Sequence, residues 1–186
     1  MADEIYGNDS RVEALWAIKA MEHAEVYFNI LCSVDPKMIP RLSQNDDEIY
    51  EKFRKDFPDM NVAALEEMKD LKSEEMKSKW RAFCEEFKHV EDFSFATLIR
   101  LNSSQDYEEV NSVIVTKIQF YAIELARNRE GHNDQIRHNF KPRKRAPKKA
   151  PGSSEGDGET GFNHQLSTEV EKELQNILTG QHALLK

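Results

Sequence analysis

Hydrophobic residues recur every three to four positions over the first thirty residues, a period that predicts an α-helix. A polar residue at any of positions 8–10 can cap its first turn, and the pattern continues to about Cys32. Apolar side chains occupy most of the helix circumference, so this helix is predicted to be central in the fold. Pro36 of "SVDP" disfavours helix at Asp35 and ends the segment. One narrow strip of the helix is clearly polar, near Arg11, Glu22, Glu25 and Asn29.

Three further segments between residues 43 and 87 have helical periodicity. Residues 43–57 place Ile49, Phe53 and Phe57 about one turn apart, and the pattern stops at the next proline. Residues 61–71 are predicted to be helical on a less regular pattern. A serine at position 73 caps a clearer amphipathic helix. Its apolar face consists of Met76, Trp80, Phe83, Cys84 and Phe87.

The period then changes to the two-residue alternation that is typical of a β-strand. In "FSFATLIRL", residues 93–101, one set of alternate positions is Phe93, Phe95, Thr97, Ile99 and Leu101. "VNSVIV", residues 110–115, is a second β-branched run, and the two runs are predicted to pair as an antiparallel hairpin. A lone hairpin is only marginally stable in water, so helices are expected to cover one of its faces.

The last segment of the body, "IQFYAIELARNREG" at residues 118–131, is predicted to be a helix capped by Thr116. Ile118, Ala122 and Leu125 lie on one face as core residues, and Gly131 allows the chain to leave in a left-handed conformation. The predicted fold is mainly α, of the α+β class. It is a compact bundle of four or five helices with one two-stranded antiparallel hairpin.

Composition divides the chain into three parts. Residues 6–135 are predicted to form one domain. Residues 136–163 are rich in Pro, Gly, Ser and charge, which predicts a disordered linker. Residues 164–180 contain a capping box and one apolar stripe, which predict a C-terminal amphipathic helix. That helix is too short to be stable alone, so it either docks on the body or binds a partner.

Charge follows the same division. Residues 1–135 carry a net charge of −11, residues 136–151 carry +7, and residues 152–186 carry −4. The basic arm has three interpretations: a nuclear import signal, a contact for RNA phosphates, for example on a ribosome, or a solvated tail that offsets an acidic body. No aromatic residues are interleaved with its charges, so base stacking is not indicated. The charged positions of the arm are Lys141, Arg143, Lys144, Arg145, Lys148 and Lys149.

Several kinds of chemistry have no pattern in this sequence. No glycine occurs from Asn8 to Glu130, which excludes the glycine-rich loops that bind nucleotides and dinucleotides. The histidines and cysteines lack the spacing of a metal site, and no serine has a nucleophile-elbow context. We therefore expect no catalytic residue, no metal and no cofactor. His23 is predicted to be a packed or rim histidine and not a metal ligand, and Cys32 and Cys84 to be reduced thiols in the core. No secretion signal or membrane span is expected.

The charged end of the last helix has two interpretations. Arg127 and Arg129 favour the negative end of the helix dipole, and either Glu124 or Glu130 can form a salt bridge with them. Alternatively, the four residues "RNRE" form a partner-binding surface, since charged side chains this dense are costly to order without partners. Those residues are Arg127, Asn128, Arg129 and Glu130.

Six motifs in this order resemble the polysaccharide biosynthesis domain-containing protein 1 family, a small eukaryotic family. The resemblance covers residues 6–133, about two thirds of the chain, and its first and last motifs are the most specific. The motifs are "YGND" (6–9), "HAEVY" (23–27), "SVDP" (33–36), "KW" with "FC" (79–80, 83–84), "EDF" (91–93) and "QFYAIELARNREG" (119–131).

The resemblance implies a dedicated chaperone that assists the folding of newly made translation elongation factor 1-alpha through its GTP-binding domain. It supplies no catalytic residue, and the glycine-free body argues against the sugar or methyl-donor chemistry that the family name suggests. A monomer in the cytoplasm, and also in the nucleus if the arm is an import signal, is expected. The alternatives are a nuclear or RNA-associated factor that acts through the arm, and a polysaccharide-related enzyme.

Overall fold

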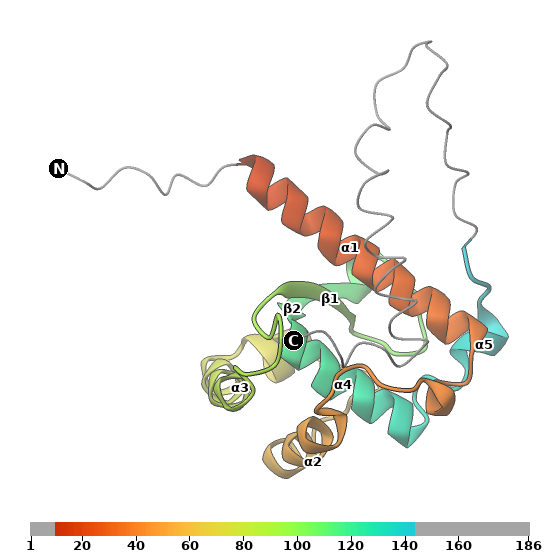
Figure 1. The fold of residues 1–186 in the computed structure, drawn as a ribbon. Helices are drawn as coiled ribbons and strands as arrows, with labels where there is room; N and C mark the ends of the chain where they lie inside the picture. The colour runs from red at the N-terminus through yellow and green to blue at the C-terminus, as the bar shows by residue number, and fades with distance from the viewer. Residues whose placement is uncertain (1–9, 144–186) are drawn as a thin grey trace.

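The computed structural model describes residues 10–143, with side chains from Trp16 onward (Figure 1). Helix α1, Ser10–Ser33, has the predicted extent, and its buried residues include Tyr27, Phe28 and Leu31. Asp35 caps the short helix η1, Pro36–Met38, by accepting a hydrogen bond from the Lys37 N–H at 3.0 Å. The chain therefore turns sharply where "SVDP" was predicted to end the helix.

Helix α2, Asp46–Asp56, begins three residues after the predicted start at 43. The buried carboxylate of Asp46 accepts from the backbone N–H groups of Leu42 and Ser43 at 2.8 and 2.6 Å. These bonds hold residues 42–45 in a turn that precedes the helix. A short loop thus replaces the first predicted helical turn.

The prediction of helix over residues 61–71 is wrong for its first half. Only the π-helix η2, Glu67–Lys72, is helical, and residues 61–66 run beside the end of the first strand. The Leu65 N–H donates to the Leu101 carbonyl, and the Ser103 N–H donates to the Ala63 carbonyl, each at 2.9 Å. Residues 63 and 65 therefore use their backbone groups to bond to a distant part of the chain, and the local backbone bond, from the Ala64 N–H to the Asn61 carbonyl at 3.2 Å, closes a single turn and no helix.

Helix α3, Glu74–Glu86, has the predicted Ser73 cap and packs against α2 through aromatic rings. Trp80 stacks on Phe57 with the ring centroids 4.3 Å apart, and Phe83 meets both α2 rings edge to face. The Trp80 indole N–H donates to the Asp70 carbonyl at 2.9 Å, which fixes η2 to α3. Burial of these rings accounts for the strong apolar face in the sequence.

The hairpin consists of β1, Ala96–Arg100, and β2, Ser112–Thr116, which are antiparallel as predicted. A short 3₁₀ helix, η3, Glu109–Asn111, leads into β2. The alternation holds for Thr97 and Ile99, which are buried, whereas Phe95 from the same set is half exposed. Arg100 belongs to the other alternate set, with Ser94, Ala96 and Leu98, and its side chain is fully buried as well.

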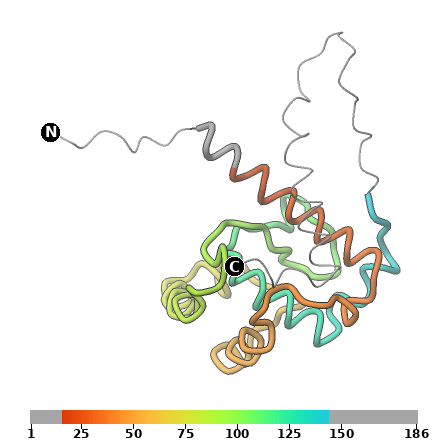
Figure 2. Tube along the Cα trace, viewed as in Figure 1, coloured from red at the N-terminus to blue at the C-terminus, as the bar shows by residue number. Residues whose placement is uncertain are grey.

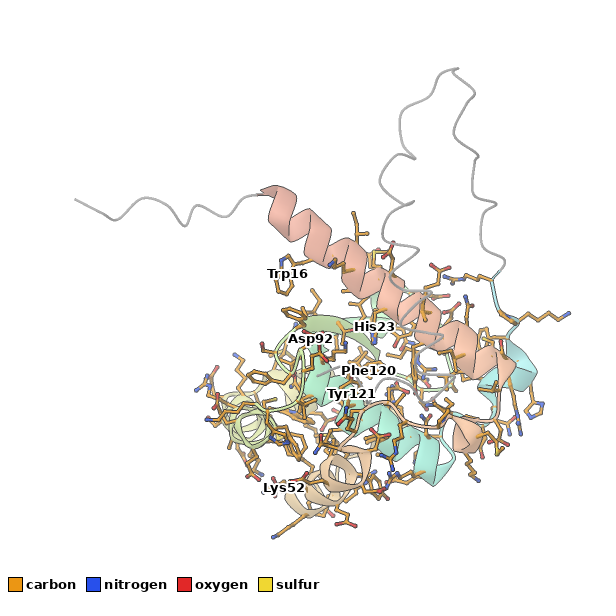
Figure 3. The ribbon with its side chains drawn as sticks, in the orientation of Figure 1. Trp16, His23, Lys52, Asp92, Phe120 and Tyr121 are labelled. Carbon is orange, nitrogen blue, oxygen red and sulfur yellow. The ribbon has the colours of Figure 1, made fainter. Side chains whose placement is uncertain are left out.

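Helix α4, Lys117–Glu130, crosses the centre of the molecule, and α1 packs along β1 (Figure 1). Thr116 and Gln119 form a capping box at its start, and Gly131 ends it at a φ of 85°. Figure 3 shows His23 of α1 facing Phe120 of α4, with the ring centroids 4.9 Å apart. His23 is thus packed, as predicted.

The folded body continues past the predicted domain boundary at 135. Helix α5, Ile136–Asn139, returns to the C-terminal part of α1 (Figure 2). Ile136 is fully buried, and the Phe140 ring lies 5.4 Å from that of Phe28. The first residues assigned to the linker therefore belong to the core, and the remainder of the linker and the predicted C-terminal helix lie outside the described residues.

Candidate partner-binding surface

The centre of α4 carries a buried group of charges, which we call the charge clamp: Arg100, Glu124 and Arg127, all fully buried. The Arg127 guanidinium donates to Glu124 at 2.8 Å, and that of Arg100 donates to both Glu124 oxygens at 3.3 Å. Arg127 also donates to the Val62 and Arg100 carbonyls at 2.7 Å each. The clamp joins α4, the end of β1 and the 61–66 segment.

Asn133 and Asn128 extend the charge clamp to α1. The Asn133 amide donates to Glu124 at 2.8 Å and to Asn128 at 2.7 Å, and its oxygen accepts from Arg100 at 2.8 Å. The Asn128 amide in turn donates to the Tyr27 hydroxyl at 3.0 Å. A polar path of buried hydrogen bonds therefore connects α1, α4 and the turn before α5.

The electrostatics of the charge clamp favour a structural role. Burial alone raises the pKa of the Glu124 carboxyl, but the Arg100 and Arg127 guanidiniums outweigh it and hold that pKa below its usual value. Arg100 and Arg127 share the single negative charge of Glu124, and the Arg100 guanidinium is also compensated by two aromatic rings. The Arg100 guanidinium lies 5.4 Å from the Phe28 ring centroid and 5.7 Å from that of Tyr107. Every Glu124 oxygen is occupied, so this carboxylate is held as a fixed ion.

The last turn of α4 brings charges to the surface, where they pair with α2. The Arg129 guanidinium donates to Asp47 at 2.6 Å and lies over the Tyr50 ring, 4.7 Å from its centroid. Glu130 accepts two hydrogen bonds from Arg54, each at 2.6 Å. These contacts make the exposed sides of α2 and α4 one continuous charged surface.

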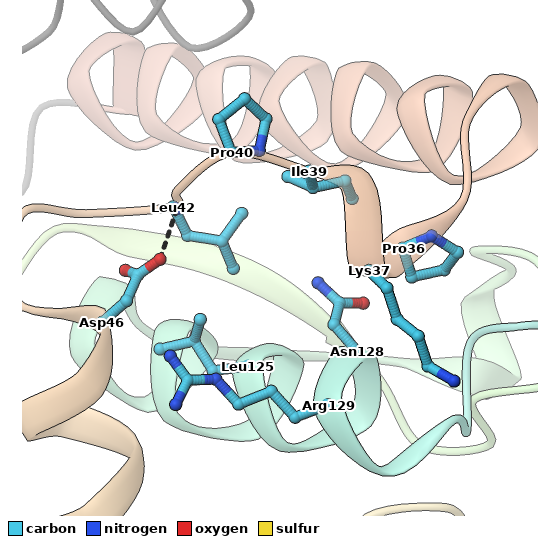
Figure 4. A pocket seen from close by; sticks show the side chains of 9 residues that line it. All are labelled: Pro36, Lys37, Ile39, Pro40, Leu42, Asp46, Leu125, Asn128 and Arg129. Carbon is cyan, nitrogen blue, oxygen red and sulfur yellow. Dashed lines mark hydrogen bonds between the residues drawn. The ribbon is translucent and has the colours of Figure 1, made fainter.

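A hollow of about 400 Å³ adjoins this surface, between the chain after η1 and the end of α4 (Figure 4). Its floor is made of buried residues, among them Leu42 and Leu125, and its rim of exposed ones, among them Lys37 and Arg129. Asp46 contributes a carboxylate to the hollow. Burial raises the pKa of this carboxyl, and its backbone hydrogen bonds only partly oppose that effect. A floor that combines apolar side chains with the buried Asp46 and Asn128, and a rim that carries cations, suits a partner side chain or a short peptide segment. The full lining is Pro36, Lys37, Ile39, Pro40, Leu42, Asp46, Leu125, Asn128 and Arg129.

The structure separates the four predicted partner-binding residues into two pairs. Arg127 and Asn128 are buried, so they support the surface from below. Arg129 and Glu130 are exposed on α4 beside α2. The sequence did not indicate the opposite wall of the hollow, although the proline-flanked apolar run "PKMIP" at 36–40 was a signal for it.

The basic arm is described only at its beginning. Lys141 is exposed, and the Arg143 guanidinium donates to Asp106 at 2.7 Å. Lys144, Arg145, Lys148 and Lys149 lie outside the described residues.

The cysteine, histidine and acidic side chains of the described residues form neither a metal site nor a disulfide. Over residues 10–143, no three His, Cys, Asp or Glu side chains are grouped as metal ligands. Cys32 and Cys84 are free thiols. No helix within the same range has the length and apolar character needed to cross a bilayer.

Known proteins resemble this chain over the same region. A family model described as PBDC1 protein matches residues 12–138. Protein PBDC1 of Homo sapiens is 49% identical over 134 residues, which cover 72% of this chain and 57% of the human protein. The Protein PBDC1 homolog of Saccharomyces cerevisiae is 39% identical over 137 residues, covering 72% of this chain and 93% of that protein. A solution NMR structure of a Saccharomyces cerevisiae protein superposes with a TM-score of 0.65 at 38% identity, covering 74% of this chain and 97% of that one.

The fold and the surface define a small, mainly helical α+β protein with a charge clamp beneath an exposed hollow. The chain belongs to the PBDC1 family, the polysaccharide biosynthesis domain-containing family that its motifs resemble. The matched region spans little more than half of the human relative's length.

Proposed function

We propose that this chain is a non-enzymatic chaperone or adaptor that binds newly made translation elongation factor 1-alpha through its GTP-binding domain. The proposal starts from the family resemblance. One structural observation supports it: "SVDP" and "RNRE", two family motifs far apart in sequence, meet at the hollow. Pro36 from the first motif and Asn128 and Arg129 from the second contribute to the same lining.

Residues of two family motifs support this surface from within. "HAEVY" supplies Tyr27, which is hydrogen-bonded to Asn128 beneath the hollow. Glu124 and Arg127 of the last motif form the charge clamp that holds the end of α4 in place. A rigid surface loses little conformational entropy on binding, which favours affinity for a protein partner.

Charge is the second argument. Residues 1–135 have a net charge of −11. Elongation factor 1-alpha is a basic protein, so opposite net charges accelerate encounter between the two proteins. The hollow would then provide the specific contact after a steered encounter, and the acidic body would make the association salt-dependent.

Calorimetric titration with the isolated GTP-binding domain, loaded with GTP or GDP, tests the proposal. Pro40→Trp places a large side chain at the rim of the hollow, and Arg129→Ala removes a rim cation. Each is expected to weaken binding by at least about tenfold, the effect typical of a residue central to an interface.

Two matched controls lie away from the hollow. Met68→Trp adds the same ring at an exposed position of η2, and Lys79→Ala removes an exposed ion pair on α3. Both are expected to bind as the unaltered chain does. Absence of binding by the unaltered chain would reject the proposed partner, whereas equal binding by all variants would reject the hollow as the contact surface.

A further inference from the structure

The hairpin is a sheet of two strands in the described part of the chain, so each strand has an outward edge. The Lys117 N–H donates to the Phe95 carbonyl at 2.8 Å, just beyond one end of the ladder. At the other end, the Leu101 N–H donates to the Asn111 carbonyl at 2.9 Å. Hydrogen-bonded and non-hydrogen-bonded pairs alternate in an antiparallel ladder, and both of these pairs are odd-numbered. The backbone groups of the even-numbered strand residues therefore point outward.

Three of these outward groups are already bonded within the fold. On β1, the Leu98 carbonyl accepts from the Tyr107 hydroxyl at 3.3 Å. The Arg100 carbonyl accepts from the Arg127 guanidinium at 2.7 Å, and α1 packs along the same strand (Figure 1). At the end of β2, the Thr116 N–H donates into the capping box of α4 at 2.9 Å. The fold thus occupies β1 and the last residue of β2.

Ser112 and Ile114 supply the other outward groups of β2. Neither residue has a hydrogen-bond partner on this side within the part of the chain that the structure describes. Ile114 is also 67% exposed, and Val110, just before the strand, is 84% exposed. Open backbone donors and acceptors beside exposed apolar side chains form a template on which a further strand can pair.

The charge beside this edge selects the occupant. Glu108 and Glu109 precede β2, are exposed, and form no ion pair with another described residue. The body as a whole, residues 1–135, has a net charge of −11. A second copy would bring the same net negative charge to the edge, whereas a segment that carries Lys or Arg would be attracted to it.

We propose that the outward edge of β2 binds an extended, basic segment of another protein as a third, antiparallel strand. The N–H and C=O groups of Ser112 and Ile114 would bond to the backbone of that segment. An apolar residue opposite Ile114 would cover its side chain, and Lys or Arg about four to six residues later would lie beside Glu108 and Glu109. The paired stretch is short, so binding is reversible. β2 contributes no residue to the hollow, so the inference does not depend on the function proposed above.

Amide hydrogen exchange of the full chain, followed by NMR, tests whether the edge is open without any substitution. The Ser112 and Ile114 amides should exchange at least about tenfold faster than those of Val113 and Val115, which bond to β1. Protection of Ser112 and Ile114 at every protein concentration would place the chain's own residues on the edge. Protection that rises with concentration would place a second copy there, and either result would overturn the proposal.

Synthetic peptides then supply the third strand. A peptide that alternates Thr and Val and ends in lysines should slow exchange of the Ser112 and Ile114 amides by at least about threefold. The same peptide with N-methylated backbone amides cannot form the strand bonds, and one that ends in glutamates lacks the attraction, so both should bind more weakly. No effect of the lysine peptide, or equal effects of all three, would overturn the proposal.

A substitution at the edge gives the complementary test. Ile114→Pro removes an outward N–H and leaves the ladder to β1, an arrangement that edge strands tolerate. It should weaken binding of the lysine peptide by at least about tenfold. The matched control, Ile114→Val, keeps the N–H and a branched apolar side chain, so its affinity should stay within about twofold. Equal affinities of the two variants would contradict strand pairing, and the N-methylated peptide decides the matter if the proline variant does not fold.

Discussion

At the scale of single residues, the charge clamp is the feature on which the interior most depends. A buried ion pair contributes little relative to apolar residues of the same volume, but removing one partner leaves an uncompensated buried charge. Glu124 is the sole carboxylate among the clamp's three charged residues, and its loss would leave Arg100 and Arg127 facing each other without it. The clamp is therefore asymmetric: its anion matters more than either cation.

Glu124→Gln is accordingly expected to lower the free energy of unfolding by about 3–5 kcal/mol. Glu130→Gln is the matched control, because it removes a carboxylate from the same helix whose partner, Arg54, is partly exposed. The control should cost at most about 1 kcal/mol. Urea unfolding monitored by tryptophan fluorescence measures both values, and equal losses would contradict the structural role of the clamp.

His23 gives the fold a pH dependence of its own. Burial, with a smaller effect from the Lys117 ammonium, lowers the pKa of its ring to about 4. In the unfolded chain the ring takes up a proton below about pH 6.5. Over this window the unfolded state binds more protons, so stability falls as the pH falls from about 6.5 towards 4.

Between about pH 7.5 and about pH 5, His23 should account for a loss of about 2 kcal/mol. His23→Gln should lose less over the same interval, because the titrating group is gone. Glu124 contributes little over this interval, because the Arg100 and Arg127 guanidiniums hold the pKa of its carboxyl below its usual value. Unfolding free energies of both proteins at the two pH values test this, and identical pH dependences would show that His23 is protonated in the fold.

At the scale of secondary structure, prediction succeeded where the signal was local. The spans of α1, α3 and α4 followed from helical period and capping residues, and the hairpin from its alternation. Residues 61–66 were mispredicted, and the burial of Arg100 was not predicted, because the partners of both are distant in sequence. The backbone of residues 63–65 bonds to residues 101–103, and the Arg100 side chain bonds to Glu124 across the core. One wall of the hollow was likewise missed, because only folding brings η1 beside α4.

Gly131 tests how strongly the end of α4 is specified. Its φ of 85° is left-handed, and an added Cβ would lie 3.2 Å from an Asp134 carboxylate oxygen. Gly131→Ala should therefore cost about 1–2 kcal/mol, the penalty for a left-handed L-residue. Gly131→Asn should cost less, since asparagine tolerates this conformation. Thermal unfolding distinguishes them; equal melting temperatures for the glycine and alanine proteins would contradict the requirement.

At the scale of the whole molecule, the folded body extends past residue 135 and includes α5, which covers part of the core. Composition placed this boundary at residue 135, because the sequence beyond it is basic and rich in proline. Composition averages over a window, however, and two apolar residues are hidden among the charges. Ile136 fills the core, and Phe140 packs on Phe28, whose ring also faces the buried Arg100. The first residues of the arm therefore cover the α1 side of the charge clamp.

Truncation at two positions distinguishes the boundaries. A chain that ends at residue 135 loses Ile136 and Phe140 and exposes the Phe28 ring, so it should be destabilised by about 3–5 kcal/mol. A chain that ends at residue 143 keeps both side chains and every contact that α5 makes with α1, so it should unfold within about 1 kcal/mol of the full chain. Chemical denaturation of the three proteins gives these differences. Equal stability of the two truncated chains would mean that α5 only rests on the body, and that the charge clamp is closed without it.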